Sequence, residues 1–365
     1  MAGPKVSVII PSYNHERFVG DAIKSVLRQD FTDFELLIAD DCSADNSVNI
    51  IKSFDDERIK TFFLSENLGP TEILRFLIEN SCGEYIALLN SDDRWCDEKL
   101  SKQVAFLDKN TACAACFTWA SLIDEQGNAC INDGDMLDPE VFIQNNRSRF
   151  EWLNRFFYYG NCLCHPSVLI RKSVYEELGY YNGAYRQLPD LEYWVRLCSK
   201  HDIYILEEVL TEHRRTTGEN QNTSASSLEN LERYTREASN IFVQTFERLD
   251  DETFIRAFGD NFIVSGAHST AEIICEKFFL LFNNATYGQT LKDQACQFYM
   301  NNYMKPGVAE CFRANYNFIQ KDFYACNVPK IETPEPSKLY VWYIKYIPEP
   351  LKRLYRFFKR LIKGK

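Results

Sequence analysis

The chain has 365 residues, of which 45% are hydrophobic, and a formal net charge of -11 at pH 7. This length exceeds one ordinary domain and the hydrophobic fraction can fill a substantial core, so we expect one large domain and a smaller region. The acidic excess argues against a general nucleic-acid-binding protein, which needs clustered Lys and Arg to neutralise phosphates. We therefore expect no nucleic-acid partner.

The start of the chain and its cysteines favour a cytosolic protein. The opening MAGPKVSVII lacks the basic segment, apolar core and cleavage site of a secretory signal. No uninterrupted apolar stretch reaches the length of a membrane span. The 13 Cys have no framework spacing, which indicates reduced thiols.

One cysteine pair could belong to a metal site. Cys113 and Cys116 form a C-x-x-C pair, which Cys162, Cys164 and His165 could complete as a zinc site. However, TACAACFTWASLI has the composition of a strand, where positions three apart face opposite sides. Buried thiols are the preferred interpretation.

Strands and helices alternate in the first half of the chain. Residues 6–10, 34–40 and 84–90 are apolar runs that predict strands, and residues 15–29, 47–54 and 71–80 have helical spacing. Such alternation implies right-handed crossovers and a parallel sheet with both faces covered. The predicted fold class is α/β, with a mainly parallel sheet sandwiched by helices.

Polar residues follow each of these strands: PSYN at 11–14, ADDCSADNS at 39–47 and NSDD at 90–93. Ligands bind beyond the carboxyl ends of parallel strands, so the three loops are expected to converge on one crevice. Turn and helix-cap roles are an alternative for four of these residues: Ser12, Asn14, Ser43 and Asp45. That alternative does not explain Asp92 and Asp93, because adjacent carboxylates repel each other unless a cation lies nearby.

A nucleotide diphosphate with a divalent ion would supply that cation. Mg²⁺ and Mn²⁺ accept a few protein oxygen ligands supplemented by phosphate oxygens and water. The chain has no Gly-rich phosphate loop of the Walker or dinucleotide type. We therefore expect the phosphates to be held through the metal rather than by backbone amides.

The motifs of the family 2 glycosyltransferases, which have the GT-A fold, resemble six segments of this chain in order and spacing. The segments are VSVIIPSYN, LLIADDCSADNS, ENLGP, GEYIALLNSDDRW, GNCLCHPSVLIRKSVYEELGYYN and LPDLEYWVRL. The resemblance covers roughly residues 5–215. It implies an inverting transferase that uses a nucleotide-activated sugar, most often a UDP-sugar, and a divalent cation.

The resemblance also implies which residues bind the donor. Pro11, Tyr13 and Asn14 match the segment that contacts the base. Asp40 and Asp41 match an acidic pair, one member of which would accept from uracil N3.

The D-x-D motif of the family is present in altered form. Asp92 matches its last acid and would hold the metal, with Asn90 and Ser91 near the ribose or diphosphate. Because Asn90 replaces the usual first acid, we expect Asp92, with Asp93, to form the metal site.

An arginine usual after the N-x-G element is also displaced. Leu74 occupies its place, and Arg75 stands one residue along, about 100° round the helix. Arg75 is kept as a candidate donor-binding residue.

The segment LPDLEYWVRLC matches the one that carries the catalytic base, and Asp190 is the candidate. Asp190 and Glu192 lie about 200° apart in a helix, so only one can face the crevice, whereas Trp194 shares the face of Asp190. Asp190 could instead only favour the helix N-terminus beside Pro189. Trp194 could stack on an acceptor sugar or pack in the core. His213 could contact the diphosphate or the acceptor, or be solvated.

Two regions follow the matched part of the chain. The polar segment 212–226 is expected to form a loop that closes over donor and metal, and residues 226–327 have helical spacing. The final segment has an apolar helical face opposite a row of Lys and Arg, which is typical of an interfacial helix bound to anionic lipid. A helix docked on the acidic surface of the protein is the alternative. The predicted domains are residues 1–218 (catalytic), 219–330 (helical) and 331–365 (membrane-associating tail).

Together these features predict an inverting glycosyltransferase, cytoplasmic and peripherally bound to the inner face of the plasma membrane. It would extend a surface glycan or its lipid-linked precursor. A non-catalytic sugar-nucleotide or glycan-binding module is the alternative, but such a module has no use for Asp190 as a base beside Asp92. A nucleotidyltransferase would need a Gly-rich loop that IIPSYNHERF lacks. The donor sugar, the acceptor, the linkage and the oligomeric state are left open.

Overall fold

The computed structural model describes residues 3–130, 140–216, 228–266 and 268–326. Residues 1–317 belong to one compact unit and residues 318–365 to a second. The predicted tail at 331–365 and the predicted boundary at 218/219 lie outside the described residues, so both stay predictions.

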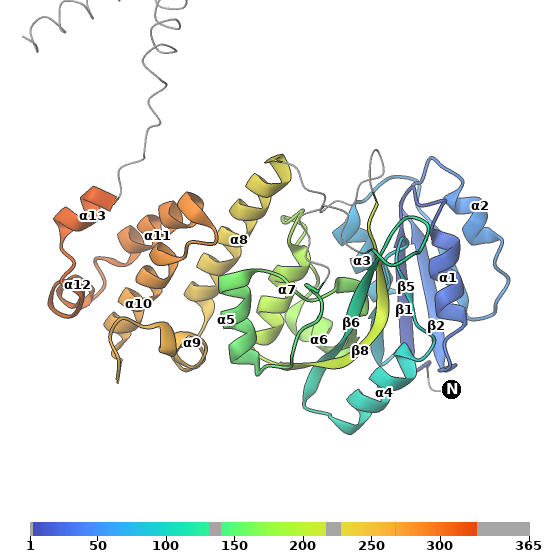
Figure 1. The fold of residues 1–365 in the computed structure, drawn as a ribbon, viewed down its shortest axis with the longest axis horizontal. Helices are drawn as coiled ribbons and strands as arrows, with labels where there is room; N and C mark the ends of the chain where they lie inside the picture. Colours follow the sequence, from blue (N-terminus) through green and yellow to red (C-terminus); the bar gives the residue numbers. More distant parts are fainter. Residues whose placement is uncertain (1–2, 131–139, 217–227, 267, 327–365) are drawn as a thin grey trace, which may run out of the picture. The chain divides into compact units, whose positions relative to one another are not determined.

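The first unit contains an eight-stranded mixed sheet in the order β3-β2-β1-β4-β7-β6-β8-β5 (Figure 1). Its strands are β1 (Val6–Ser12), β2 (Phe34–Asp40), β3 (Ile59–Phe63), β4 (Tyr85–Leu88), β5 (Arg94–Trp95), β6 (Cys113–Ile123), β7 (Leu169–Arg171) and β8 (Asp202–Arg214). β3, β2, β1 and β4 pair in parallel, as do β6 and β8. β7 runs antiparallel between β4 and β6, and β5 runs antiparallel to β8. The prediction of a mainly parallel α/β sheet is confirmed.

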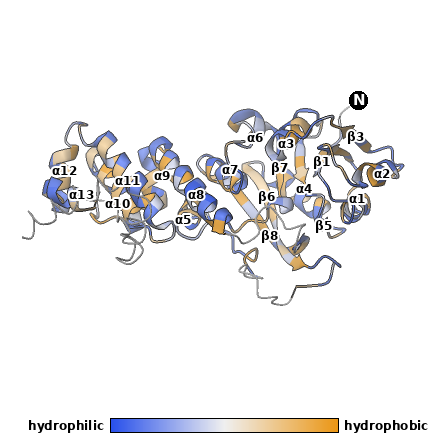
Figure 2. Ribbon diagram, turned by 90° about the horizontal axis from the view of Figure 1, so that it is seen from above, coloured by the Kyte–Doolittle hydropathy of each residue, from blue (hydrophilic) through white to orange (hydrophobic). Residues whose placement is uncertain are grey.

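Helices cover this sheet. They are α1 (Val19–Leu27), α2 (Ser47–Lys52), α3 (Pro70–Glu79), α4 (Lys99–Lys109), α5 (Arg149–Tyr159), α6 (Lys172–Leu178) and α7 (Pro189–Cys198). All residues of β2 and β4 are buried, which explains why β4 is continuously apolar and why Glu35 is the one charged residue before the end of β2. Figure 2 shows the apolar strands between more polar helical surfaces.

One face of the sheet carries the main core. Val6, Val8 and Ile10 of β1 pack in one cluster with residues of α1 and α4. Successive strand residues face opposite sides, so Ile9 points to the other face, where α3 packs against β1. The α1 and α3 crossovers therefore lie on opposite faces and leave the carboxyl ends of the parallel strands open to the loops.

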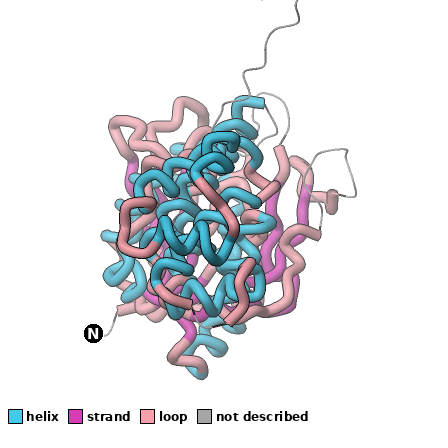
Figure 3. The backbone as a smooth tube through the Cα atoms, turned by 90° about the vertical axis from the view of Figure 1, so that its left-hand side faces the viewer, coloured by secondary structure: helices cyan, strands magenta, loops and turns pink. Residues whose placement is uncertain are grey.

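A helical region follows the sheet in the chain. Its helices are α8 (Leu228–Arg248), α9 (Asp251–Phe258), α10 (Thr270–Asn283), α11 (Gly288–Asn302), α12 (Val308–Tyr316) and, in the second unit, α13 (Gln320–Cys326). α5 joins the region to the sheet, because Asn154 donates to the carbonyl of Ala257 and Asn284 donates to that of Phe157. Figure 3, in which the left-hand side of Figure 1 faces the viewer, shows helices in front of the strands. No helix within the described ranges combines the length and apolar character needed to cross a membrane.

Two features differ from the sequence-based predictions. The short strands β3, β5 and β7 were not predicted, and β5 has only two residues. Glu212–Arg214 is part of β8, paired with β6, rather than of a loop. The rest of that predicted loop, residues 217–226, lies outside the described part, and its closure over the donor stays a prediction.

Candidate active site

The loops after β1 and β2 are tied to each other at the edge of the sheet. Asn14 has a φ of 51°; its N–H donates to Ser43 Oγ (2.8 Å) and its Oδ1 accepts from the N–H of Ala44 (2.8 Å). The carboxylate of Asp40 accepts from the N–H and the hydroxyl of Ser43 at 2.8 and 2.7 Å. Ser43 and Asn14 thus have the turn role that their residue types allow, and they fix the predicted base-contacting segment.

Asp41 fixes the start of α3. Its Oδ1 accepts from the N–H of Leu68 (2.7 Å) and its Oδ2 from the N–H of Gly69 (2.9 Å), where the chain turns with a φ of 87°. Asp40 and Asp41 are only 1% and 3% exposed. Each carboxylate therefore already serves the loops around the crevice, and reading of the uracil by one of them stays a prediction.

Tyr13 is the exposed aromatic side chain of the segment predicted to contact the base. It is 48% exposed, whereas the neighbouring Ser12 is buried, and Pro11 is partly buried. A half-exposed aromatic ring offers a stacking surface to a base. Tyr13 is thus the candidate in this segment whose position best suits direct contact with a nucleotide.

Asp92 and Asp93 follow β4 but have different surroundings. Asp93 is 1% exposed; its Oδ1 accepts from the N–H of Arg214 (2.7 Å) and its Oδ2 from Asn90 Nδ2 (2.9 Å). His213 Nδ1 lies 3.1 Å from the same Oδ1, without the alignment of a hydrogen bond. Because both oxygens of Asp93 already accept a hydrogen bond within the chain, Asp92 is the better-placed metal ligand, and a part for Asp93 in the metal site stays a prediction.

Asp92 remains the candidate metal ligand. It is 7% exposed. Burial raises the pKa of Asp92 to about 6, and the neighbouring Asp93 adds to the rise, whereas His15 and His213 oppose it. A bound cation would favour the charged form of such a carboxylate.

His15 is a residue of this crevice that the sequence did not reveal. Its ring Nδ1 lies 2.7 Å from Ser91 Oγ, and its backbone N–H donates to Ser47 Oγ (3.0 Å). This contact joins the loop after β1 to the loop after β4, so the predicted convergence of these loops is seen directly. Only the position of His15 directly after PSYN could have suggested its role.

Arg214 at the end of β8 is a second residue that the sequence did not reveal. Its Nε donates to the carbonyl of Asp92 (2.8 Å), and its Nη1 donates to the carbonyls of Asp124 and Glu125 (2.9 and 3.1 Å). The side chain is 1% exposed. Arg214 thus fixes the backbone of the acidic strand end against the loop that follows β6.

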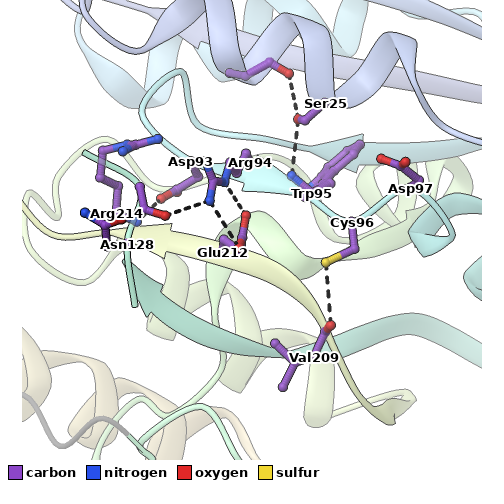
Figure 4. Close-up of polar contacts among 12 residues, drawn as sticks. Ser25, Asp93, Arg94, Trp95, Cys96, Asp97, Asn128, Val209, Glu212 and Arg214 are labelled. Atoms are coloured by element: carbon purple, nitrogen blue, oxygen red, sulfur yellow. Dashed lines mark hydrogen bonds and ion pairs between the residues drawn. The ribbon is translucent and has the colours of Figure 1, made fainter. Parts of the chain in front are cut away.

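A hollow of about 620 Å³ lies beside this network, lined by Asp21, Arg28, Arg94, Trp95, Cys96, Asp97, Glu98 and Glu212. Figure 4 shows the ion pair of Arg94 with Glu212 there, close to Asp93 and Arg214. None of the predicted donor, acceptor or base residues lines this hollow. We therefore place the candidate active site at the strand ends and not here.

The case for a metal site depends mainly on the side chain of Asp92. Among the described residues, no group of three or more His, Cys, Asp or Glu could hold a metal ion. Cys113 and Cys116 are buried free thiols. Asp92 fits a divalent ion whose other ligands are diphosphate oxygens and water, and such an ion would be bound with the nucleotide.

Asp190 lies in the first turn of α7, directly after Pro189. Its Oδ2 accepts from Asn161 Nδ2 (2.7 Å) and its Oδ1 from the N–H of Leu191 (2.7 Å). Burial raises the pKa of Asp190 to about 6, although these hydrogen bonds oppose the rise. The site therefore holds the carboxylate in one orientation and keeps it basic enough to take a proton near neutral pH.

The other acid and the tryptophan of α7 have structural roles. Glu192 Oε2 pairs with Arg196 at 2.7 Å, four residues along the helix. Trp194 is 0% exposed, and its ring packs against Phe117 and His165 with centroids 4.9 and 5.7 Å apart. The prediction that Trp194 stacks on an acceptor sugar is therefore corrected, because its ring belongs to the core.

The two remaining candidates, Arg75 and His213, have different surroundings. Arg75 is exposed on α3, where it pairs with Glu79 (2.9 Å) and lies over the ring of Tyr180 (5.5 Å). His213 is a partly buried strand residue, with 16% of its side chain exposed beside Asp93. The structure thus favours His213 over Arg75 as a contact of the crevice, and a fully solvated His213 is not observed.

The segment around Cys164 lies within the electrostatic influence of both Asp93 and Asp190. Burial raises the pKa of Cys164, and both Asp93 and Asp190 add to that rise. Burial lowers the pKa of His165 to about 4, and Asp93 opposes this as well. The acidic end of β4 and the first turn of α7 therefore approach the same segment of chain.

Sequence comparison identifies relatives of this chain. The family model described as Glycosyl transferase family 2 matches residues 7–179. The putative teichuronic acid biosynthesis glycosyltransferase TuaG of Bacillus subtilis is 34% identical over 214 residues, 58% of this chain and 79% of the relative. The putative glycosyltransferase EpsE of the same organism is 30% identical over 200 residues, 53% of this chain and 67% of the relative.

Solved structures share the fold. Staphylococcus aureus TarS 1–349 in complex with UDP-GlcNAc has a TM-score of 0.54 and 18% identity, covering 88% of this chain and 89% of that one. The mannosyltransferase PcManGT from Pyrobaculum calidifontis, in complex with GDP-Man and Mn²⁺, has a TM-score of 0.50 and 13% identity, covering 91% and 88%. These coverages exceed what residues 1–218 can supply, so the shared fold includes part of the helical region.

The fold and the strand-end crevice define a glycosyltransferase with the GT-A fold. Because the chain matches the family model and is 34% identical to TuaG over 79% of that protein, it belongs to glycosyl transferase family 2.

Proposed function

We propose that this glycosyltransferase transfers a sugar from a UDP-sugar to a hydroxyl of a glycan or lipid-linked glycan, with inversion at the sugar carbon. The bound UDP-GlcNAc and UDP of two TarS structures support a uridine nucleotide. The name of TuaG supports a role in surface polysaccharide biosynthesis. A hexose or an N-acetylhexosamine is the sugar class proposed.

The setting of Asp190 is the observation that carries this proposal. Its carboxylate is oriented by Asn161 and the N–H of Leu191, and burial raises its pKa to about 6. In an inverting displacement, Asp190 takes the proton of the acceptor hydroxyl while the hydroxyl oxygen attacks the sugar carbon and the bond to the diphosphate breaks. A carboxylate with an ordinary pKa near 4 would be a weaker base at neutral pH.

Asp92 is proposed to bind the divalent ion, Mn²⁺ or Mg²⁺, at the donor. The ion supplies positive charge that stabilises the departing diphosphate. Arg214 would keep Asp92 in place, because it donates to the carbonyl of Asp92 and to the carboxylate of the next residue, Asp93. Tyr13, Asn14 and the acidic pair after β2 would surround the nucleoside.

The basic tail, residues 331–365, is proposed to bind an anionic membrane surface. Its amphipathic sequence combines an apolar face with a row of cations. A position at the cytoplasmic face of the membrane would bring the active site to a lipid-linked acceptor.

Separate measurements of nucleotide binding and transfer test the role of Asp190. Asp190→Asn should bind UDP as the wild type does but transfer sugar roughly 10² to 10⁴ times more slowly. Glu192→Gln is the matched control, because Glu192 lies on the same helix turn and pairs with Arg196 instead. Equal losses of transfer in both variants would show that the two acids only stabilise α7. An active Asp190→Asn variant beside an inactive Glu192→Gln variant would show that Glu192, and not Asp190, is the base.

A further inference from the structure

The helix α8 places polar residues next to both segments that hold Asp190. Asn230, Tyr234 and Glu237 recur at intervals of four and three residues, so they share one face of α8. Glu237 is buried, at 7% exposed. Buried carboxylates need partners, and the partners of Glu237 lie at the start of α7.

Glu237 binds the turn that leads into Asp190. Its Oε1 accepts from the N–H of Arg186 (2.9 Å), and its Oε2 accepts from the N–H groups of Gln187 (2.8 Å) and Leu188 (2.9 Å). Gln187 Nε2 also donates to Asn230 Oδ1 (3.0 Å). Three successive N–H groups therefore converge on one carboxylate, two residues before Asp190.

Tyr234 contacts the second segment that holds Asp190. A Cβ on Gly160 would clash with Tyr234 Oη, so the hydroxyl packs directly against the backbone of Gly160. The next residue, Asn161, donates to the carboxylate of Asp190. One face of α8 therefore supports both the turn before Asp190 and the residue that orients its oxygens.

We propose that α8 is a positioning element of the active site, in which Glu237 and Tyr234 set the location of the Asp190 carboxylate. The inference rests on the proposed role of Asp190 as the base. Glu237 does not touch the reacting atoms; it fixes the turn from which α7 begins. It gives the helical region, in which no motif could be assigned from the sequence, a function in the transfer step.

Glu276 provides a matched control within the same helical region. It is 0% exposed and accepts from the N–H groups of Ile263 (2.9 Å) and Val264 (2.8 Å) and from the hydroxyl of Tyr316 (2.9 Å). Glu276→Gln therefore removes the same kind of buried carboxylate from the helical region without touching the surroundings of Asp190.

The test compares Glu237→Gln, Glu276→Gln and Asp190→Asn in the full chain by transfer rate, UDP affinity and melting temperature. Displacement of a reacting group by a fraction of an ångström to 1 Å costs about 10 to 10² in rate. We expect Glu237→Gln to lose transfer by that factor, with unchanged UDP affinity and a melting temperature no lower than that of Glu276→Gln, which keeps its transfer rate. Tyr234→Phe, which removes one hydroxyl, serves as a second variant if Glu237→Gln does not fold, and a slower transfer is expected there too.

Two results would overturn the inference while leaving the base assignment intact: wild-type transfer by Glu237→Gln when Asp190→Asn is inactive, or equal losses in Glu237→Gln and Glu276→Gln. An active Asp190→Asn variant would instead overturn the base assignment, and the positioning role with it.

Discussion

Replacing Asp190 by Asn should make the protein more stable above pH 6, although it slows transfer. The pKa of Asp190 rises from 3.8 to about 6, mainly through burial. That difference corresponds to about 3 kcal/mol at roughly 1.4 kcal/mol per pKa unit. Because the folded state holds the proton more tightly than the unfolded state, Asp190 costs no stability below its ordinary pKa and its full amount above pH 6.

The net gain should be smaller than this figure. An Asn at position 190 keeps an acceptor for the N–H of Leu191, but its amide would face the amide of Asn161. Asn161 cannot simply turn round, because its Oδ1 accepts from the N–H of Leu163 (3.1 Å). Asp190 is also partly exposed, so solvent screens part of the electrostatic cost. We expect a gain of about 1 to 2 kcal/mol at pH 8, or a rise in melting temperature of about 1 to 3 °C.

Thermal unfolding of the wild type and Asp190→Asn at pH 5 and pH 8 measures this effect. The gain should be larger at pH 8, where the wild-type carboxylate is charged, than at pH 5. Glu192→Gln, which loses an ion pair with Arg196, should show no such gain at either pH. A gain that is independent of pH, or a loss of stability at pH 8, would refute the reasoning that burial raises the pKa of Asp190.

Four other outcomes are expected. Asp92→Asn and a chelator should each nearly abolish transfer, since Asp92 is the candidate metal ligand; full activity in a chelator would contradict the metal site. Asp93→Ala should lower the free energy of unfolding by about 2 to 4 kcal/mol in denaturant titrations, because buried donors lose their acceptor; an unchanged value would contradict the anchoring role. Deletion of residues 337–365 should abolish co-sedimentation with anionic vesicles but leave donor hydrolysis intact; a truncated protein that still sediments would show that the tail is not the anchor. Lys99 is fully buried, and burial lowers its pKa to about 7, so the stability of the wild type should rise with pH above that value. Lys99→Met should therefore raise the melting temperature more at pH 6 than at pH 9. An equal rise at both pH values would contradict a buried charge on Lys99.

The strand-end part of the site could be predicted because its signal is local. Each parallel strand is a continuous apolar run, and the polar residues that end it must meet at one edge of the sheet. The contact of His15 with Ser91 across two such loops shows that this inference held. The base candidate came from the resemblance to the family, which Asp190 matches, and helix periodicity added only that Glu192 points in a different direction.

The distribution of buried contacts could not be predicted in this way. Nothing local distinguishes Asp93 from Asp92, since the difference is made by Arg214, which lies 121 residues along the chain. Trp194 shares a helical face with Asp190, yet its ring is enclosed by Phe117 from a distant strand. In the sequence, Glu237 cannot be distinguished from the other acids of a polar helix. Its role becomes clear only from its hydrogen bonds with the N–H groups of residues 186–188.

The buried position of Asp93 also accounts for the departure from the D-x-D pattern at residue 90. Asn90 Nδ2 donates to Asp93 Oδ2 at 2.9 Å, and a carboxylate at position 90 would have no hydrogen to donate. It would instead add a third negative charge beside two acids in a site that is almost closed to water, which is costly unless a cation compensates it. The two adjacent acids are therefore tolerated because Asp93 is hydrogen-bonded within the chain. The bond from Asn90 to Asp93 requires a donor at position 90, where the family motif usually has an acid. If Asp92 is the main protein ligand of the proposed ion, affinity for the ion should depend strongly on the diphosphate that arrives with it.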